Sequence, residues 1–363
     1  MKYNINEISV APSVEKIPFV AEALDRLTLH YGQIRICDKE GSEAPALDAL
    51  SKHRIYFLPY SGQFLKPCPG TTEHICCGYQ ILNVGTNCPM DCSYCILQSY
   101  FNQPGLRVFA NIHRGLREVL EVIDSAPDRI FRIGTGEFTD SLALDPIVEW
   151  TRLLLPEFSR RKNVILELKT KTNNINGILK TGIRDRIVVS WSLNSPTIAS
   201  REEHGAPTIK KRLKAARKCQ QEGYAIGFHF DPLIYYPGWK QGYRETIEMM
   251  ARYLEPKDII WISMGSFRFM PDLKQIIRKR HPDSLILNGE FVPGKDGKMR
   301  YYKTIRVELY SFVRQLLEQW STDLGLYLCM EAADVWEAAM GWSPGNSQGL
   351  GEYLDTRVKK IFG

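Results

Sequence analysis

Three cysteines set close together are the residues of this sequence best suited to bind a metal. Cys88, Cys92 and Cys95 follow Asn87 with the spacing Cys-x3-Cys-x2-Cys, and an aromatic residue precedes the last cysteine. Thiolates at this spacing can ligate three irons of a cubane [4Fe–4S] cluster, whereas full ligation takes four cysteines. The fourth iron then stays open to an exogenous ligand, which predicts a redox-active cluster. Two other interpretations are a structural zinc site, normally closed by four ligands, and three incidental cysteines.

The cysteine segment lies directly after the first of six strand-like stretches. Each stretch is short, nearly continuous in apolar character and rich in Ile, Val and aromatic residues, as strands buried on both faces are. These stretches are Tyr79–Val84, Ile130–Gly134, Val164–Lys169, Ile187–Leu193, Tyr224–Phe230 and Ile259–Met264. The cysteines therefore fall on a loop at the carboxyl end of the first strand.

Amphipathic stretches between the strands predict helices. They are Gly115–Ser125, Asp145–Phe158, Thr208–Glu222, Tyr243–Leu254 and Pro271–Arg280. Strand–helix units in series imply a parallel sheet with right-handed crossovers. Six strands are too few for a closed eightfold barrel, so we expect an α/β fold, an open (β/α)6 partial TIM barrel. In such a sheet, ligands collect at the carboxyl ends of the strands.

The predicted barrel leaves a segment at each end of the chain. Residues 1–77 are predicted to form a small mixed N-terminal extension, and residues 78–281 the barrel. Residues 282–363 are predicted to form a C-terminal extension on the substrate side. This extension contains a strand or hairpin at Arg300–Lys303 and helices at Val307–Trp320 and Ala332–Met340.

The composition limits the class of protein. The formal charge is +6 and the pI about 8.7, short of the value above about 9 that is typical of dedicated nucleic-acid domains. No apolar run is long enough to span a membrane, and no apolar segment follows a basic start as in a secretion signal. The nine cysteines are an odd number in a long chain, which argues against a disulfide framework and favours a reducing cytoplasm.

The cysteine triplet resembles the signature of the radical S-adenosylmethionine (SAM) superfamily. This resemblance implies a [4Fe–4S] cluster and SAM as cofactors, with the methionine amino and carboxylate groups bound to the open iron. One electron from the reduced cluster then breaks the C5′–S bond and gives a 5′-deoxyadenosyl radical. The chemistry belongs to the cofactor, and the protein supplies orientation and excludes water.

Polar residues after the next strands fit the same resemblance. Gly134, Thr135 and Gly136 end the second strand, where the superfamily carries a glycine-rich motif that receives the methionine amino group. Lys171 follows the third strand and is placed to pair with the methionine carboxylate. Ser192 and Asn194 end the fourth strand and offer hydroxyl and amide groups to the ribose or the carboxylate. An ordinary turn and a solvated loop lysine are the alternative interpretations.

Further stretches are similar to the spore photoproduct lyase family, radical enzymes that revert a thymine–thymine adduct in DNA. They keep their order over roughly residues 76–310, and the glycine–tryptophan segment and the Leu97–Gln98 pair after the cysteines indicate the lyase branch. The stretches are Cys92–Gln98, Arg107–Asn111, Phe138–Asp140, Thr170–Lys171, Ser192–Asn194, Gly223–Phe228, Pro232, Gly238–Tyr243 and Arg268–Phe269.

The lyase resemblance assigns further roles. It places Thr139 and Asp140 near the methionine carboxylate and the substrate. The segment with Arg300, Tyr301 and Lys303 resembles the basic–aromatic segment that handles the lesion and its phosphate. Arginine can clamp phosphate with two hydrogen bonds, and tyrosine can stack on a base. The alternative interpretation is an edge strand with solvated basic residues.

Two positions depart from the lyase pattern. The family has a cysteine that returns hydrogen to the product radical, and Glu137 stands at that position here. The family also has a second tyrosine after the last cluster cysteine, in a hydrogen-relay pair, and here Tyr94 remains with Ile96 as its partner. A carboxylate O–H bond is too strong to donate a hydrogen atom as a thiol does. The chain therefore resembles a divergent member of the family. By position in the family pattern, the catalytic candidates are Tyr94, Glu137 and Asp140.

The other cysteines have less specific interpretations. Cys68, Cys76 and Cys77 are structural thiols by default, with a second cluster or metal site as the alternative, and Cys329 is an alternative hydrogen donor. His229 lies near the end of an apolar strand and is interpreted as a satisfied core histidine.

Three functions remain in view. The first is a radical, lyase-like enzyme that repairs a pyrimidine lesion in DNA, for which the base must leave the stack. The second is a radical SAM enzyme acting on a small molecule, a peptide or RNA. The third, a non-catalytic iron–sulfur protein, is disfavoured because it needs no cofactor pocket. The partners we expect are DNA and an electron donor such as flavodoxin or ferredoxin, with no membrane contact and a monomeric chain.

Overall fold

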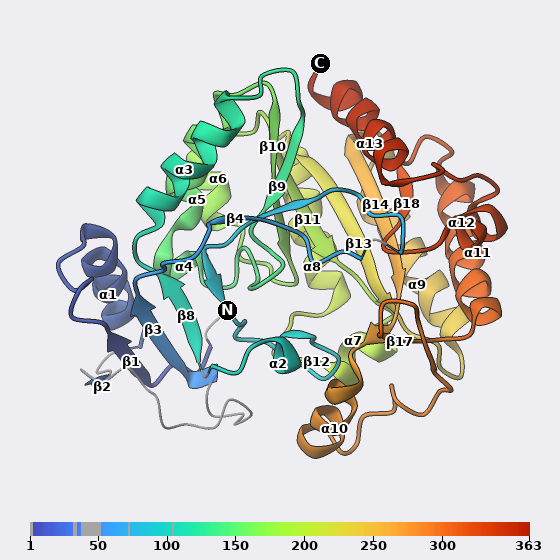
Figure 1. Cartoon of the computed structure of the whole chain (residues 1–363), viewed down its shortest axis with the longest axis horizontal. Coiled ribbons are helices and arrows are strands. Elements are labelled where there is room, and N and C mark those ends of the chain that lie inside the picture. The colour runs from blue at the N-terminus through green and yellow to red at the C-terminus, as the bar shows by residue number, and fades with distance from the viewer. Residues whose placement is uncertain (1–2, 32–34, 38–51, 72, 104) are drawn as a thin grey trace.

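The computed structural model describes residues 3–31, 35–37, 52–71, 73–103 and 105–363 (Figure 1). At its centre lies an eight-stranded sheet with the strand order β18-β14-β13-β11-β10-β9-β5-β4. All neighbouring strands are parallel except the edge pair β4–β5, which is antiparallel. The central strands are apolar and buried along nearly their whole length, because helices cover one face and the barrel interior the other.

The six predicted strands lie side by side in chain order, so the predicted open α/β partial barrel is confirmed. They are β5 (Gln80–Leu82), β9 (Phe131–Gly134), β10 (Val164–Thr170), β11 (Ile187–Ser192), β13 (Ala225–Leu233) and β14 (Ile259–Ser266). Two strands extend the sheet beyond them, β18 (Leu326–Leu328) at one edge and β4 (Leu65–Pro67) at the other.

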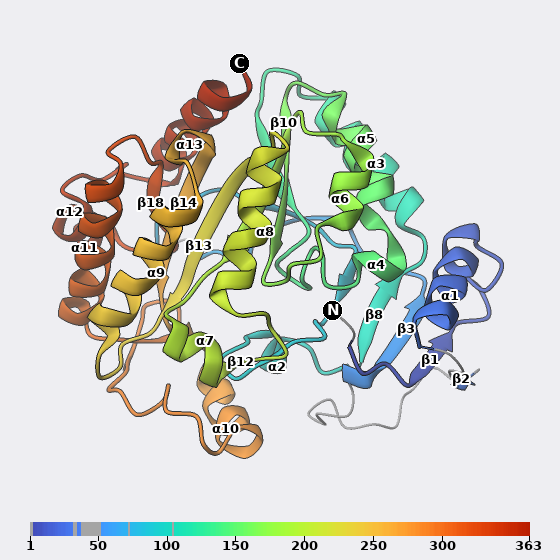
Figure 2. The same cartoon turned by 180° about the vertical axis from the view of Figure 1, so that it is seen from behind.

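Helices cover the outer face of the sheet. Figure 2 shows α6 (Asn176–Thr181), α8 (Ile209–Gln221) and α9 (Trp239–Tyr253) in front of the strands. α8 buries Leu213, Ala216 and Cys219 on the side that packs against the sheet. The inner face of the strands is thereby left to line a cavity.

The helix predicted over Asp145–Phe158 is broken in two. α4 (Asp145–Val148) and α5 (Trp150–Ser159) are separated by Glu149, whose φ of 51° lies in the left-handed region. The carboxylate of Asp145 accepts hydrogen bonds from the backbone and hydroxyl of Thr151, at 2.9 and 2.7 Å. These bonds hold the break. The other predicted helices correspond to α3 (Ile112–Asp124), α8, α9 and α10 (Pro271–Arg280).

A second sheet has the order β2-β1-β3-β8-β6, with three strands from before the barrel and two, β6 and β8, from between the barrel strands β5 and β9. β1 (Glu7–Val10) pairs in parallel with β2 (Arg35–Cys37) and β3 (Arg54–Leu58), and α1 (Pro18–Tyr31) follows β1. β8 (Leu106–Phe109), a strand the sequence analysis did not predict, pairs in parallel with β3 and antiparallel with β6 (Gly85–Thr86). This sheet holds β6, which leads directly to Cys88. The division at residue 77 stays a prediction.

The C-terminal segment adds three helices and a small antiparallel sheet. The sheet has the order β15-β17-β16, from Arg268–Phe269, Met299–Arg300 and Val292–Pro293. The strand expected at Arg300–Lys303 is therefore shifted, since Lys303 already begins α11 (Lys303–Trp320). α12 (Ala333–Met340) matches its prediction, and α13 (Ser347–Phe362) was not predicted. No helix of the described residues is long and apolar enough to span a bilayer.

Candidate active site

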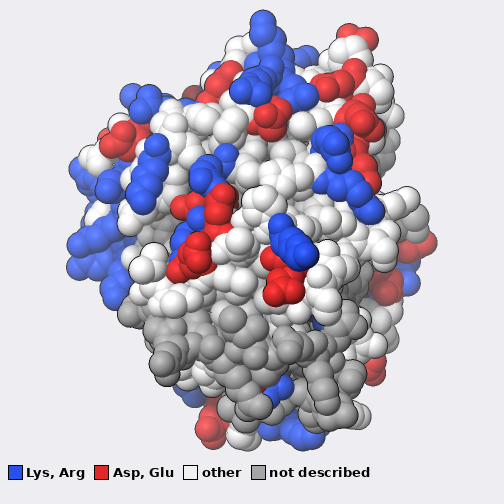
Figure 3. Space-filling view, turned by 90° about the vertical axis from the view of Figure 1, so that its left-hand side faces the viewer, with Lys and Arg blue, Asp and Glu red and all other residues white. Residues whose placement is uncertain are grey.

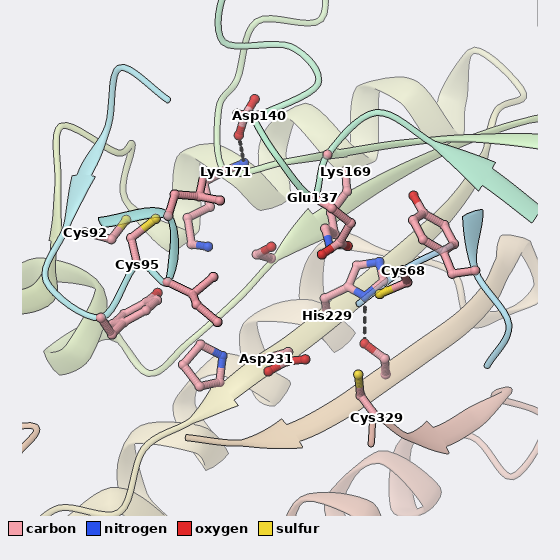
Figure 4. Close-up of a pocket in the computed structure, with 18 of the residues that line it drawn as sticks. Cys68, Cys92, Cys95, Glu137, Asp140, Lys169, Lys171, His229, Asp231 and Cys329 are labelled. Carbon is pink, nitrogen blue, oxygen red and sulfur yellow. Dashed lines mark hydrogen bonds and ion pairs between the residues drawn. The ribbon is translucent and has the colours of Figure 1, made fainter. Parts of the chain in front are cut away.

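A cavity of about 300 Å³ opens inside the partial barrel, at the carboxyl ends of the strands (Figure 4). Its lining comes from the cysteine segment at one end and from the inner face of the sheet at the other. Of the predicted site residues, the cavity brings together Cys88, Cys92, Tyr94, Cys95, Gly136, Glu137, Thr139, Asp140, Lys171 and Ser192.

The cysteine segment is held in place by its neighbours in space. Cys92 belongs to β7 (Asp91–Cys92), which pairs antiparallel with β12 (Glu203–His204). The backbone nitrogen of Cys95 donates to the carbonyl oxygen of Cys92 at 3.1 Å, so the chain turns between these two residues. Burial raises the pKa of the Cys88 thiol, and it raises that of Cys92 to about 12. A bound cation reverses this effect, because it stabilises the thiolate.

The arrangement of these thiols fits an iron–sulfur cluster better than a single ion. No group of three or more His, Cys, Asp or Glu side chains in the described part of the chain is placed to hold one metal ion. The three thiols nevertheless line one cavity. A cubane cluster presents a separate iron to each thiolate. It therefore suits three thiols that line one cavity without converging on a single point. The described residues thus form no closed zinc site.

The loop after β9 lies tightly against β10, and its glycines permit this. A Cβ on Gly134 would lie 2.6 Å from the carbonyl oxygen of Glu167, and one on Gly136 would lie 2.8 Å from that of Lys169. Any side chain there would push the loop off the sheet. The hydroxyl of Thr135 donates to Ser141 at 2.7 Å and does not line the cavity, so this residue fastens the loop to itself.

Thr139 and Asp140 follow in the same loop with different roles. The hydroxyl of Thr139 lines the cavity, is buried and has no hydrogen-bond partner among the residues that the structure describes. Such an atom is expected where a polar ligand group is missing. The carboxylate of Asp140 instead accepts hydrogen bonds from the protein itself. Its four donors are the Thr170 hydroxyl at 2.7 Å, the Lys171 and Ala143 nitrogens at 2.8 Å and the Leu142 nitrogen at 3.0 Å. Asp140 therefore anchors the loop.

Lys171 and Tyr94 face each other beside the cysteines. The Lys171 ammonium lies 5.7 Å from the centroid of the Tyr94 ring. Among the described residues, Lys171 forms no ion pair, so its charge is available to an anionic ligand. The Tyr94 hydroxyl donates to the buried carboxylate of Glu203, which is also paired with the buried Arg212. Tyr94 thus ties the cysteine segment to β12 and α8.

The two polar residues that end β11 differ in their surroundings. Ser192 lines the cavity, as predicted. Asn194 does not, because its side chain is hydrogen-bonded to a residue of β13 and a residue of α9. It donates to the carbonyl oxygen of Pro232 and accepts from the Tyr243 hydroxyl, both at 2.8 Å. The structure therefore places Asn194 as a clamp between β11, β13 and α9.

The structure does not bring the predicted substrate residues to the cavity. Arg300 is buried in β17, where it pairs with Asp296 at 2.6 Å. The fully buried Tyr301 accepts a hydrogen bond at 3.2 Å from the nitrogen of Tyr235. Lys303 pairs with an exposed acid, Asp334, on the neighbouring α12. Of the predicted basic–aromatic segment, Arg300 and Tyr301 therefore lie in the core, and Lys303 lies on the surface.

Several cavity residues escaped the sequence analysis. Glu167 accepts hydrogen bonds from His229 at 2.9 Å and Trp261 at 2.8 Å, and the other nitrogen of His229 lies 2.6 Å from the Ser263 hydroxyl. His229 is thus satisfied, as expected, but it also lines the cavity. A charged residue inside an otherwise apolar strand, as Glu167 is in β10, was the available signal. Asp231 and Arg268 form a second pair, with both contacts at 3.1 Å.

Glu137 occupies the wall between these groups. Its carboxylate is paired with the ammonium of Lys169. Ile96, in contrast, is 39% exposed at the mouth of the cavity. Neither of these positions offers a group that donates hydrogen atoms.

Comparison with known proteins gives a consistent result. The spore photoproduct lyase family model matches residues 73–322. The chain is 27% identical over 202 residues to spore photoproduct lyase of Geobacillus sp. (strain Y412MC61), covering 55% of this chain and 59% of that protein. It is 25% identical over 246 residues to spore photoproduct lyase of Bacillus subtilis (strain 168), covering 64% and 67%. The match therefore spans less than two thirds of the Geobacillus protein.

Solved structures show the same fold. Spore photoproduct lyase complexed with dinucleoside spore photoproduct superposes with a TM-score of 0.79 at 22% identity, covering 90% of this chain and 100% of that one. A mutant of that enzyme with bound AdoMet and dinucleoside spore photoproduct gives a TM-score of 0.78 at 21% identity, covering 90% and 99%. At this level of identity, the likeness concerns the fold.

Proposed function

Since the chain belongs to the spore photoproduct lyase family, we propose that it cleaves SAM with a [4Fe–4S] cluster and repairs a pyrimidine lesion in DNA. One observation carries this proposal. The three cysteine thiols, the unpaired Lys171 ammonium and the unpartnered Thr139 hydroxyl all line a single cavity. When bound, the cluster supplies the electron that opens the C5′–S bond of SAM and so generates a radical.

The residues of the chain bind the cluster and SAM and orient them toward the substrate. Cys88, Cys92 and Cys95 hold the cluster, and Lys171 attracts the methionine carboxylate. Thr139 offers its hydroxyl to a polar group of SAM or of the substrate. Asp140 fixes the position of both Thr139 and Lys171 through its hydrogen bonds to the loop and to β10.

We also propose an electron donor, a cellular compartment and a direction of approach for DNA. A one-electron donor such as flavodoxin or ferredoxin would reduce the cluster, in the reducing cytoplasm that free thiols require. On the described part of the face that carries α1 and α3, acidic and basic side chains lie beside one another (Figure 3). Glu22 and Glu149, for example, each pair with Arg26 and Arg152. We propose that DNA approaches the mouth of the cavity, because the residues assigned to the cluster and to SAM line that cavity.

A second function is favoured by the wall of the cavity. The ion pair between Glu137 and Lys169 stands where the family has its hydrogen-donating cysteine. A radical SAM enzyme acting on a small molecule, a peptide or RNA would not need that cysteine. The chain's cofactor site would be the same, and only the substrate would differ.

An anaerobic turnover experiment distinguishes the two functions. The reduced, reconstituted protein is given SAM and an oligonucleotide that carries one spore photoproduct, with the undamaged oligonucleotide and the Cys92→Ala protein as controls. DNA repair predicts that mass spectrometry finds restored thymines only with the wild type. Binding to the lesion-bearing duplex should also weaken with salt, with a log–log slope of about −0.9 per phosphate contacted. Salt-independent, negligible binding and an unchanged lesion would contradict the proposal.

A further inference from the structure

The end of the cavity that lies away from the cluster cysteines carries three further thiols. Cys68, Cys77 and Cys329 line it, and Figure 4 shows Cys68 and Cys329 across the cavity from Cys92 and Cys95. No three of these thiols are gathered in a way that could hold a metal ion, among the residues that the structure describes. Cys68, Cys77 and Cys329 form no disulfide within the described residues, and all three line the cavity as free thiols.

Cys68 enters the cavity from an element remote from the cluster loop. It follows β4, and its backbone nitrogen donates to the carbonyl oxygen of Tyr79 at 2.9 Å, which continues the pairing of β4 with β5. This bond fixes the thiol beside Glu137. After burial itself, the Glu137 carboxylate is the strongest influence that raises the pKa of Cys68. The thiol therefore keeps its hydrogen at neutral pH.

The other two thiols at this end of the cavity, and the Tyr94 hydroxyl near the cluster cysteines, are occupied. The sulfur of Cys329 accepts a hydrogen bond from Arg268 at 3.4 Å, and its thiol donates to Asp231. Cys77 is hydrogen-bonded to Cys76. The Tyr94 hydroxyl is committed to Glu203. The thiol of Cys68 makes no hydrogen bond within the described residues, so transfer of its hydrogen breaks no existing contact.

A carbon radical formed in the cavity must gain a hydrogen atom before the product can leave. Thiols are the protein groups best suited to this step, because the S–H bond is weak and the sulfur radical is stable. We propose that Cys68 donates this hydrogen atom. The inference rests on the proposed function, and it names the hydrogen donor that Glu137 cannot be.

The step balances with one co-reactant. The product C–H bond forms as the S–H bond of Cys68 breaks, and the unpaired electron moves to sulfur as a thiyl radical. A low-molecular-weight thiol from solution then gives its hydrogen atom to the half-buried Cys68. Two of the resulting solution thiyl radicals combine to a disulfide, which leaves Cys68 as it began.

Deuterium reports on this transfer directly. A thiol exchanges its hydrogen with solvent, so turnover of the photoproduct oligonucleotide in D2O should place one solvent deuterium on the restored thymine. Cys68→Ala and Cys68→Ser should both lose the label while they still cleave SAM. The serine variant keeps a polar side chain, but its O–H bond is too strong to donate. Cys219→Ala, in the interior of α8, should keep the label and serves as the matched control.

The outcomes separate the two claims. A labelled product from Cys68→Ala, or an unlabelled product from the wild type, would overturn the role of Cys68 and leave the proposed function intact. If Cys329→Ala loses the label and Cys68→Ala keeps it, Cys329 is the hydrogen donor and the inference is wrong. If the wild-type protein leaves the photoproduct unchanged, that result would contradict both the proposed function and this inference.

Thiol labelling gives a readout that does not depend on turnover. In the anaerobic holoenzyme at alkaline pH, which increases the thiolate fraction of Cys68, N-ethylmaleimide is expected to modify Cys68 more slowly when dinucleoside photoproduct fills the cavity. Cys76, which does not line the cavity, should react at the same rate with and without the dinucleoside. An unchanged rate at Cys68 under saturating dinucleoside would contradict its contact with substrate.

Discussion

The carboxylate of Asp140 accepts a 2.8 Å hydrogen bond from the backbone nitrogen of Lys171, which joins the loop after β9 to the end of β10. The loop carries the Thr139 hydroxyl, and β10 leads to the Lys171 ammonium. One buried acid therefore sets the spacing of two groups that face the cofactor cavity.

Asp140→Asn should destabilise the fold and shift the Thr139 hydroxyl relative to the Lys171 ammonium. An amide cannot accept from all four donors, and hydrogen bonds to a charged acceptor are worth about 1.5–3 kcal/mol each. We expect the free energy of unfolding, measured with urea, to fall by about 2–3 kcal/mol, together with weaker SAM binding. The exposed Asp283→Asn should change neither quantity. Unaltered stability with lost SAM cleavage would instead make Asp140 a proton-transfer group.

Lys171→Ala should weaken SAM binding and leave stability nearly unchanged. The ammonium has no acidic partner among the described residues, so its removal strands no buried charge. A lost charge-assisted contact of about 1.5–3 kcal/mol corresponds to about a 10- to 100-fold rise in Kd. Equilibrium dialysis of the reconstituted protein measures this, with the exposed Lys180→Ala as the control. Equal affinity in both variants would remove Lys171 from the cofactor site.

Tyr94→Phe tests whether Tyr94 positions the cluster loop or relays hydrogen. The variant keeps the ring beneath Lys171 and loses only the bond to Glu203. We expect a loss of about 2 kcal/mol in the free energy of unfolding and faster loss of bound iron, with SAM cleavage retained. The exposed Tyr100→Phe is the control. Full stability combined with absent deuterium transfer would show a relay role instead.

Because of Glu167, the free energy of unfolding should decrease as the pH falls below 4.5. Burial acts to raise its pKa, but the pairing with His229 and the hydrogen bonds from Ser190 and Trp261 hold it at about 2, against an ordinary 4.5. A depressed pKa stabilises the fold above pH 4.5, and this contribution is lost as the pH falls from 4.5 towards 2. At about 1.4 kcal/mol per pKa unit, the contribution is on the order of 3 kcal/mol.

The measurement is the urea midpoint between pH 7 and pH 3.5. Glu167→Gln should be less stable than the wild type at pH 7 and should lose less stability on acidification. The exposed Glu245→Gln should follow the wild-type curve. Parallel curves for Glu167→Gln and the wild type would contradict the role given to this pair.

The sequence allowed the barrel to be predicted, because each central strand is buried on both faces and therefore reads as an apolar run. It did not reveal β8, whose four residues pair with β3 from a distant part of the chain. α13 carried a usable signal, since Leu350, Leu354 and Val358 recur every four residues on its buried face. The break at Glu149 depends on hydrogen bonds from Thr151 to Asp145, which no periodicity reports.

The site was predictable where the chemistry lies in a local motif. The three cysteines, Gly136 after β9 and Lys171 all line the cavity. The roles of Asp140 and Asn194 depend on partners in other elements, so residue type alone suggested ligands where the structure places anchors. Arg300 and Tyr301 are internal because β17, beside its neighbour β16, also pairs with β15, which lies far earlier in the chain at Arg268–Phe269.

The most direct test of the account is the formation of 5′-deoxyadenosine. Anaerobically reconstituted, reduced protein is incubated with SAM, and the nucleoside is quantified by chromatography beside the Cys92→Ala and Cys219→Ala variants. The account predicts 5′-deoxyadenosine from the wild type and Cys219→Ala, and none from Cys92→Ala. A wild-type protein that binds iron and sulfide but forms no 5′-deoxyadenosine would contradict the central claim that the three cysteines hold a radical-generating cluster.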